Sequence, residues 1–204
     1  MTTVGKILVG VLISGRGSNL QSLLDASKAE SFPARIVLVI SNVETAGGLA
    51  RASAAGVPVQ IITHKGKTRE QFDAQLNQAL RMAGVEIVCL AGFMRILSDG
   101  FARDWEGKLL NIHPSLLPAY KGTQVHERVI AAGEKQSGAS VHFVVPELDA
   151  GPIISQSTVP VLATDTPETL AARVLEAEHR LYPTALRLVC ESRVRLENGA
   201  VVST

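Results

Sequence analysis

The chain of 204 residues has few aromatic residues and few cysteines, and its charges almost cancel. Its two cysteines, Cys89 and Cys190, lie far apart, which argues against a disulfide-stapled secreted domain and favours a reducing, cytoplasmic location. Twenty Lys and Arg residues stand against 19 Asp and Glu, giving a net charge of +1. Because no basic stripe emerges, a nucleic-acid partner lacks its electrostatic support. We expect small-molecule partners instead.

Long hydrophobic runs and metal-binding spacings are missing as well. The apolar segment at residues 7–13 is too short to cross a bilayer, and it runs into Ser-Gly-Arg-Gly rather than a small-residue cleavage site. The five histidines and two cysteines form neither an H-E-x-x-H nor a C-x-x-C pattern. We therefore expect no membrane partner and no metal.

Aliphatic residues make up most of what is present. Hydrophobic residues reach 46% while aromatics are only 4%, a composition typical of parallel sheets between helices. Apolar runs of strand length alternate with amphipathic helical segments, one of which follows a capping box that begins at Thr68. The runs cover residues 6–14, 34–41, 57–62, 86–91 and 109–113. This alternation predicts an α/β fold, a mostly parallel twisted sheet in a single domain over residues 1–204.

The regular alternation of strands and helices ends after Pro118. A short helix is expected at residues 126–132, followed by two apolar runs at residues 139–145 and 152–161. The loop between these runs, residues 146–151, is too short for a helical crossover. The last two strands of the sheet should therefore pair antiparallel.

A long helix and a hairpin are predicted at the end of the chain. Thr166 is a suitable N-cap for the helix and Pro167 suits its first turn. Pro183 is expected to kink or divide this helix, because it lacks a backbone N–H and its ring crowds the preceding turn. Asn198 and Gly199 then predict a tight turn within a hairpin at residues 193–202.

The most informative stretch is the apolar run at residues 109–118, which contains two polar side chains, Asn111 and His113. On a strand, this spacing points both toward one face, while Leu110 and Ile112 point into a core on the other. Pro114 keeps His113 extended at the strand's end. An amide donor and an imidazole aimed into one space suit a carbonyl that becomes an oxyanion while a proton moves. The alternative is a satisfied, partly buried histidine.

A glycine-rich loop, Gly-Arg-Gly-Ser-Asn at residues 15–19, connects the first strand to a helix. Backbone amides at a helix N-terminus bind anions, so Gly17, Ser18 and Asn19 are candidates for a phosphate site. A dinucleotide site fits less well, because Leu20 stands where a third glycine is wanted. The alternative is an ordinary tight turn with Ser18 or Asn19 as the N-cap.

Two carboxylates and one further histidine are candidates with open roles. Asp149 is either a turn residue or a charge partner that would favour protonated His113, although spacing cannot show that it reaches the imidazole. Glu178 continues the row of Leu170 and Val174 on the long helix, where a carboxylate needs a structural Arg or Lys or a ligand as its partner. His142 either supports the cleft or belongs to the core.

Residues 94–97, Met-Arg-Ile-Leu, follow the fourth predicted strand and bring apolar atoms to the same edge of the sheet. A flat heterocycle could lie against them. A hydrophobic strand-to-helix turn is an equally ordinary reading of this segment.

Four segments, in chain order, closely resemble the phosphoribosylglycinamide formyltransferases of purine biosynthesis. They are residues 13–19, 90–97, 111–118 and 148–152, and the resemblance covers nearly the whole chain. It implies a Rossmann-like formyltransferase fold with helices on both faces of the sheet. It also implies transfer of a formyl group from 10-formyltetrahydrofolate to the amine of phosphoribosylglycinamide, by a protein that is a monomer or a homodimer.

The resemblance also implies roles for individual residues. The catalytic residues would be Asn111, His113 and Asp149. The substrate would be held by Gly17, Ser18, Asn19 and Glu178. The folate would contact Asn111 and Asp149 together with Arg69, Met94, Arg95, Ile96, Leu97, Val145 and Leu148. The chain departs from some relatives at Gln124, where a histidine can stand, and at Arg16, where asparagine occurs.

Three other functions are compatible with parts of this pattern. A formyltetrahydrofolate deformylase would use the same Asn and His with water as the acceptor, but usually carries an extra N-terminal domain. A methionyl-tRNA formyltransferase would add an RNA-binding domain, for which this chain has neither the length nor the charge. A non-catalytic nucleotide-binding module would need the glycine loop but not the Asn111, His113 and Asp149 set.

Overall fold

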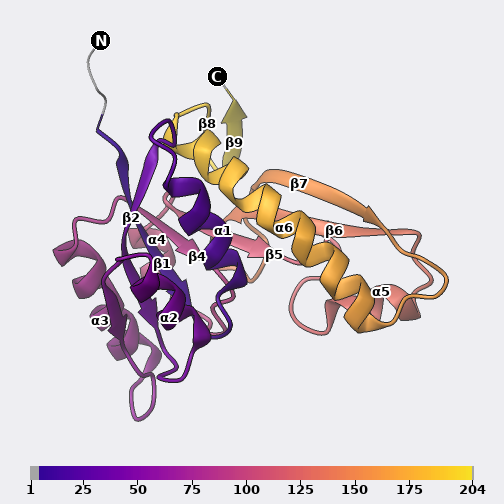
Figure 1. Ribbon diagram of the computed structural model, residues 1–204, viewed down its shortest axis with the longest axis horizontal. Helices are drawn as coiled ribbons and strands as arrows, with labels where there is room; N and C mark the ends of the chain where they lie inside the picture. Colours follow the sequence, from indigo (N-terminus) through magenta and orange to yellow (C-terminus); the bar gives the residue numbers. More distant parts are fainter. Residues whose placement is uncertain (1–4, 204) are drawn as a thin grey trace.

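The computed structural model describes residues 5–203, so the expected domain of residues 1–204 extends at both ends beyond the described part. The first half of the chain alternates strands and helices (Figure 1). Its elements are β1 (Ile7–Ile13), α1 (Ser18–Ser27), β2 (Ala34–Ser41), α2 (Gly47–Ala54), β3 (Val59–Ile61), α3 (Arg69–Met82), β4 (Ile87–Leu90), α4 (Asp99–Asp104) and β5 (Leu109–His113).

The second half contains two strands in succession and then the longest helix. Its elements are α5 (Val125–Ala131), β6 (Gln136–Phe143), β7 (Ile153–Pro160), α6 (Pro167–Cys190), β8 (Val194–Glu197) and β9 (Ala200–Ser203). In Figure 1, β6, β7 and α5 extend away from the other elements, and α6 runs diagonally along the molecule. None of the helices within residues 5–203 is long and apolar enough to cross a membrane.

The seven-stranded sheet has the order β3-β2-β1-β4-β5-β6-β7. The pairs from β3 to β5 are parallel, and β6 pairs antiparallel with both β5 and β7. The expected change from parallel to antiparallel pairing is therefore confirmed. The antiparallel pairing of β6 with β7 follows from the short loop between them, which leaves no room for a helix to return the chain to the opposite end of the sheet.

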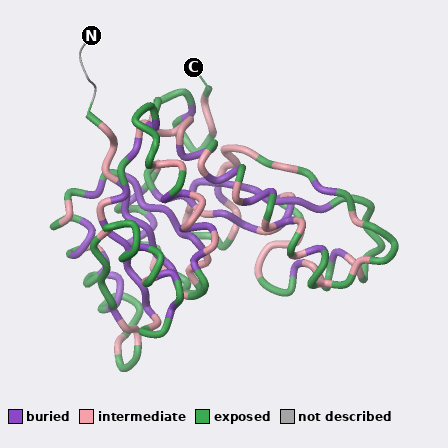
Figure 2. Tube along the Cα trace, viewed as in Figure 1, coloured by how far each residue is buried: buried purple, intermediate pink, exposed green. Residues whose placement is uncertain are grey.

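Helices cover both faces of the sheet, and each face has its own hydrophobic core. The larger core contains side chains of α1, α5 and α6, and the smaller one contains those of α3 and α4. In β5, Leu110 and Ile112 belong to the larger core while Leu109 belongs to the smaller. The central strands β1, β4, β5 and β6 run through the interior as mostly buried segments, whereas the edge strand β3 is exposed (Figure 2). The predicted α/β fold with helices on both faces is confirmed.

Helix α6 continues through Pro183, so the prediction that this residue divides the helix is wrong. Packing outweighs the lost backbone hydrogen bond here. The neighbouring Tyr182 is fully buried, and its hydroxyl donates to the carbonyls of Leu90 (3.0 Å) and Leu110 (3.2 Å). These bonds attach α6 to β4 and β5, beneath the strand ends that carry the candidate site.

Local signals in the sequence are reliable where they are strong. Thr68 and Thr166 both form capping boxes at the helix starts predicted for them. Asn198 and Gly199 have φ values of 50° and 76° and turn the predicted hairpin between β8 and β9. Both residues adopt the left-handed conformation that tight hairpin turns require.

Candidate active site

The carboxyl ends of β1, β4 and β5 meet at one edge of the sheet. The strand order reverses between β1 and β4. From β1 the chain adds β2 and β3 on one side of the sheet, and from β4 it adds β5, β6 and β7 on the other. Open α/β sheets bind ligands at such a switch point. Two cavities open there, of about 250 Å³ and about 680 Å³, and both are lined by Gly92 and Met94.

The smaller cavity lies over the glycine loop. Gly17 has φ 72° and is the N-cap of α1, and no side chain caps this helix. The alternative in which Ser18 or Asn19 is the N-cap is therefore wrong, since Ser18 is already the first helical residue. A Cβ at Gly17 would lie 2.5 Å from the Gly48 Cα, so only glycine fits this close approach of two backbones. The first-turn amides are left without a side-chain partner.

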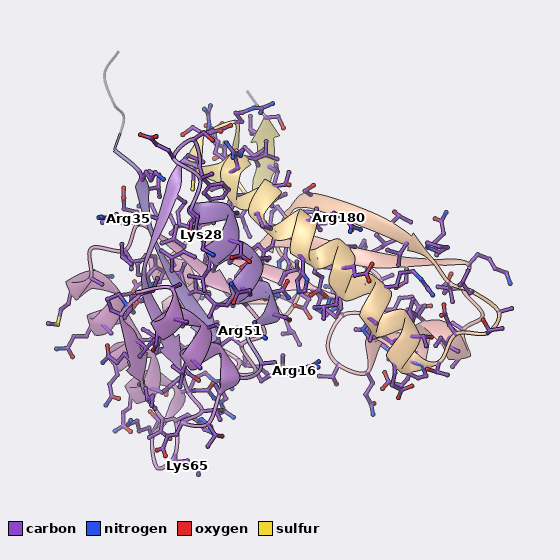
Figure 3. The ribbon with its side chains drawn as sticks, viewed as in Figure 1. Arg16, Lys28, Arg35, Arg51, Lys65 and Arg180 are labelled. Carbon is purple, nitrogen blue, oxygen red and sulfur yellow. The ribbon has the colours of Figure 1, made fainter. Side chains whose placement is uncertain are left out.

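Arginines surround this loop. Arg51 of α2 donates from Nε to the carbonyl oxygen of Arg16 (2.9 Å) and so braces the loop from the side. Figure 3 shows the Arg16 and Arg51 side chains near each other. The positive charges of these arginines and the free backbone amides of the loop both favour the binding of an anionic group.

Glu178 lies beside the glycine loop and is buried. Its Oε2 accepts a hydrogen bond of 2.6 Å from Asn19 Nδ2. Burial raises the pKa of Glu178, and the bond from Asn19 opposes part of that shift. The sequence suggested Arg or Lys as a structural partner, but within residues 5–203 neither forms an ion pair with this carboxylate. Asn19 Oδ1 is buried and has no partner among the described residues.

The larger cavity brings together Asn111, His113 and Asp149. Asp149, in the β6–β7 loop with φ 48°, places Oδ2 at 3.4 Å from His113 Nδ1, although the sequence alone could not show that it reaches this residue. The same Oδ2 accepts from the Gly122 backbone N–H (2.9 Å), and His113 Nε2 lies 2.9 Å from the Tyr120 carbonyl oxygen. Both nitrogens of the buried His113 ring therefore face oxygen acceptors.

His142 belongs to this group, although it is absent from the predicted site. Its Nε2 lies 3.1 Å from Asn111 Nδ2, and its Nδ1 lies 2.8 Å from the Phe143 carbonyl oxygen. Burial lowers the pKa of His142, while Phe143 and Asp149 oppose that shift and His113 adds to it. The sequence signal was present, because His142 alternates with the apolar Val141 and Phe143 on β6.

Most residues predicted to contact folate line the larger cavity. They are Asn111 and Asp149 together with Met94, Arg95, Ile96, Leu97, Val145 and Leu148. Met94, Ile96 and Leu148 are exposed by 71%, 57% and 53%, so their apolar atoms are available to a ligand. Arg69 begins α3 as an exposed residue and lies outside the lining of both cavities.

One loop contributes more to the cavity than the sequence indicated. Residues 122–124 and the first turn of α5, residues 125–127, line it. Gln124 has φ 54°, and the buried His126 Nδ1 has no hydrogen-bond partner within residues 5–203. The predicted site omits this loop because Gln124 departs from some relatives. Its contribution depends on the Asp149 bond to Gly122, which no sequence spacing reveals.

Ser14 holds the wall between the two cavities. Its N–H donates to the Gly92 carbonyl oxygen (3.2 Å), and its Oγ accepts from the Met94 N–H (2.8 Å). The same hydroxyl donates to Asn42 Oδ1 (2.6 Å), and the amide nitrogen of Asn42 lies 3.3 Å from His64 Nδ1.

Within residues 5–203, no group of three or more His, Cys, Asp or Glu side chains is arranged to hold a metal ion.

Comparisons with known proteins agree with this geometry. Residues 6–186 match the family described as formyl transferase. The chain is 43% identical to the phosphoribosylglycinamide formyltransferase of Escherichia coli, over 93% of this chain and 90% of that protein. The crystal structure of glycinamide ribonucleotide transformylase 1 from Symbiobacterium toebii superposes with a TM-score of 0.94 at 44% identity, covering 97% of this chain and 94% of the other.

Longer relatives also match. The chain is 52% identical to the trifunctional purine biosynthetic protein adenosine-3 of Bos taurus over 96% of its own length. It spans only 20% of that protein. Together with the motifs, the sheet and the matches across nearly the full length, these similarities show that the chain belongs to the phosphoribosylglycinamide formyltransferase family.

Proposed function

We propose that this chain, as a single domain over residues 1–204, transfers the formyl group of 10-formyltetrahydrofolate to the amine of phosphoribosylglycinamide in de novo purine biosynthesis. One observation carries the proposal. An amide donor, an imidazole and a carboxylate lie in a large cavity that shares a wall with a smaller one over the glycine loop. Two substrates in these cavities would bring an amine and a formyl group together.

The smaller cavity would hold the phosphoribosyl substrate. Its phosphate would lie on the backbone N–H groups of Gly17, Ser18 and Asn19, where the helix dipole also favours negative charge. Glu178 would accept hydrogen bonds from the sugar hydroxyls or from the glycinamide. The burial of this carboxylate beside an unpaired Asn19 oxygen supports a polar ligand at this point.

The larger cavity would hold the folate. Its ring system would lie against residues 94–97 and the loop from Val145 to Asp149, and its charged tail would extend outward. Arg69 would contact this tail from outside the cavity lining. A pocket with apolar walls and a few convergent polar groups is typical of sites for flat heterocycles.

The transfer would proceed directly between the substrates. The neutral amine attacks the formyl carbon, and the carbonyl oxygen becomes an oxyanion stabilised by N–H groups of Asn111 and His113. The bond from this carbon to the folate nitrogen then breaks. A proton leaves the former amine and reaches the departing folate nitrogen through His113 or water, while Asp149 orients the imidazole.

Two features of the structure bear on this chemistry. His113 Nε2 faces the Tyr120 carbonyl, so the formyl oxygen must replace that acceptor before it can bond to the imidazole. A covalent acyl-enzyme is not needed. Cys89 is fully buried with its thiol pKa raised by burial, and Cys190 lies in the last turn of α6.

A single assay distinguishes the candidate functions. The protein is mixed with 10-formyltetrahydrofolate, with and without phosphoribosylglycinamide, and deformylated folate is followed. We expect turnover only with the acceptor present. Turnover without it would identify a deformylase, and no turnover in either mixture would leave a nucleotide-binding module.

Cysteine usage supports a reducing cytoplasm as the location. Cys89 and Cys190 are both free, and neither forms a disulfide. The choice between monomer and homodimer stays a prediction, to be tested by sedimentation of the purified protein.

A further inference from the structure

His142 is a residue of β6, and its ring lies between the Asn111 amide and the Phe143 carbonyl. It is 2% exposed and lies directly opposite Asn111 in the antiparallel pairing of β5 with β6. Residues opposite each other in such a pair project their side chains to the same face of the sheet. The imidazole and the Asn111 amide therefore meet at the cavity wall, where their nitrogens lie 3.1 Å apart.

The backbone determines which ring nitrogen of His142 carries the proton. Nδ1 lies 2.8 Å from the Phe143 carbonyl oxygen, which can only accept, so Nδ1 must be the N–H. In the neutral ring, Nε2 is then an acceptor. It faces the Nδ2 of Asn111, which can only donate, so the two assignments agree.

A charged His142 ring would disrupt this arrangement. With protons on both nitrogens, the ring would present an N–H to the amide N–H of Asn111. Burial lowers the pKa of this ring and so favours its neutral form, while the Phe143 carbonyl and Asp149 oppose part of that shift. Asp149 Oδ1 lies 3.8 Å from His142 Nε2, too far for a hydrogen bond, while its Oδ2 faces Gly122 and His113.

The surrounding backbone is shaped to hold the Phe143 carbonyl in place. The register of β6 against β7 shifts between Val141 and His142, a bulge that redirects side chains at this point. Gly151 then brings the next strand so near that a Cβ there would lie 1.7 Å from the Phe143 oxygen. The anchor of His142 Nδ1 therefore depends on a bulge and a glycine.

We propose that His142 is a positioning residue that fixes the orientation of the Asn111 amide. One N–H of Asn111 Nδ2 is donated to His142 Nε2, and the other is left to stabilise the oxyanion. Without an acceptor at Nε2, the amide is free to turn and to place its carbonyl oxygen where a donor is needed. This inference rests on the role of Asn111 in the proposed function.

Two substitutions separate the functions of the two ring nitrogens. Asparagine reaches only to the level of Nδ1, whereas glutamine can place an acceptor oxygen at the level of Nε2. We expect His142→Asn to lower kcat by about 10-fold to 100-fold, as the loss of an orienting partner typically does. KM for both substrates should stay within about twofold, and His142→Gln should recover most of kcat. Equal losses in both variants would overturn the proposal.

A double-mutant cycle tests whether His142 acts through Asn111. In an Asn111→Ala background, His142→Asn should lower kcat by less than about twofold, because the group that it orients is gone. If the full loss of the single variant appears again in this background, His142 acts independently and the inference fails. Circular dichroism and thermal unfolding of each variant confirm that the fold is retained.

A spectroscopic measurement is independent of turnover. Long-range proton–nitrogen spectra of the wild-type protein, assigned with His142→Gln, should show the proton of the neutral His142 ring on Nδ1. A proton on Nε2 would overturn the inference. If the wild-type protein lacks formyl transfer, the proposed function fails. If it is active and the tautomer or the cycle disagrees, only the role of His142 fails.

Discussion

The two cavities of this protein are built in different ways. The smaller one, over the glycine loop, presents backbone amides, and its shape depends on one residue, Gly17, with a positive φ. The larger one presents polar side chains of β5, of β6 and of the loop after it, and residues 92–97 and 122–127 also line it. The expected binding function therefore depends on the backbone geometry around Gly17, whereas the expected chemistry depends on strand pairing between distant parts of the chain.

The largest effect should follow from a change in the larger cavity. Asn111→Ala should lower kcat by about 10²-fold to 10³-fold, as removal of an oxyanion donor typically does, and His113→Ala by at least about as much. KM for the phosphoribosyl substrate should change little, because its anchor lies in the other cavity. Steady-state kinetics with saturating folate measures both. Near-native kcat in His113→Ala would contradict the assignment of the site.

A backbone change in the smaller cavity should produce the opposite pattern. Gly17→Ala places a side chain at φ 72° and against Gly48, so the loop must rearrange. We expect KM for the phosphoribosyl substrate to rise about 10-fold to 100-fold, from the usual cost of a strained left-handed residue. Affinity for a folate analogue, measured by calorimetry, should stay the same.

Gly15→Ala is the matched control for this loop. A Cβ at Gly15 would meet no other atom within 4 Å, and the residue has no positive φ. Because Gly15 also lines the smaller cavity, this variant should raise KM for the phosphoribosyl substrate, but less than Gly17→Ala does. If Gly15→Ala and Gly17→Ala raised KM equally, the close approach of Gly17 to Gly48 would not be the cause.

The wall between the cavities should couple them weakly. Ser14→Ala removes the hydroxyl that joins Met94 to Asn42, a contribution of about 1 kcal/mol for two ordinary hydrogen bonds. We expect KM for both substrates to rise about threefold. Ser27→Ala, at the other end of α1, removes a hydroxyl bonded to the Leu24 carbonyl and should leave both constants unchanged. A change in only one constant would show that the wall does not serve both cavities.

The smallest effect concerns stability. Burial raises the pKa of Glu178, so folding opposes its charged form at pH 7. Glu178→Gln keeps an acceptor for Asn19 without the charge and should raise the free energy of unfolding at pH 7, while KM for the phosphoribosyl substrate also rises. This gain in the free energy of unfolding should shrink as the pH falls from the raised pKa of folded Glu178 to the ordinary pKa of an unfolded glutamate. Once Glu178 is protonated, it is as neutral as the glutamine that replaces it.

Urea denaturation at several pH values measures this gain, with Glu176→Gln as the control on the same helix. Glu176 is exposed, so its substitution should change stability little. A stability of Glu178→Gln below that of the wild type at pH 7 would mean that the carboxylate has a stabilising partner.

Patterns of short range predict the fold well. Alternating apolar runs, two capping boxes and the Asn198–Gly199 turn each depend on neighbouring residues, and the structure contains them all. The expected division of α6 at Pro183 does not occur, and the sequence gives no measure of the packing around Tyr182 that holds this helix in place. In the candidate site too, local patterns are predictable and distant contacts are not. The spacing of Asn111 and His113 predicts their shared face, but the 3.4 Å approach of Asp149 and the contact with His142 depend on strand register.

The hydrogen bond from Asn19 to Glu178 connects residues 159 positions apart. Such a contact requires the closure of a long loop, and the entropy cost of that closure must be offset by the other contacts between α1 and α6. The glycine loop is not purely local either, because Gly17 packs against Gly48 of α2. We therefore expect the smaller cavity to take its final shape only when α2 and α6 have both docked onto α1.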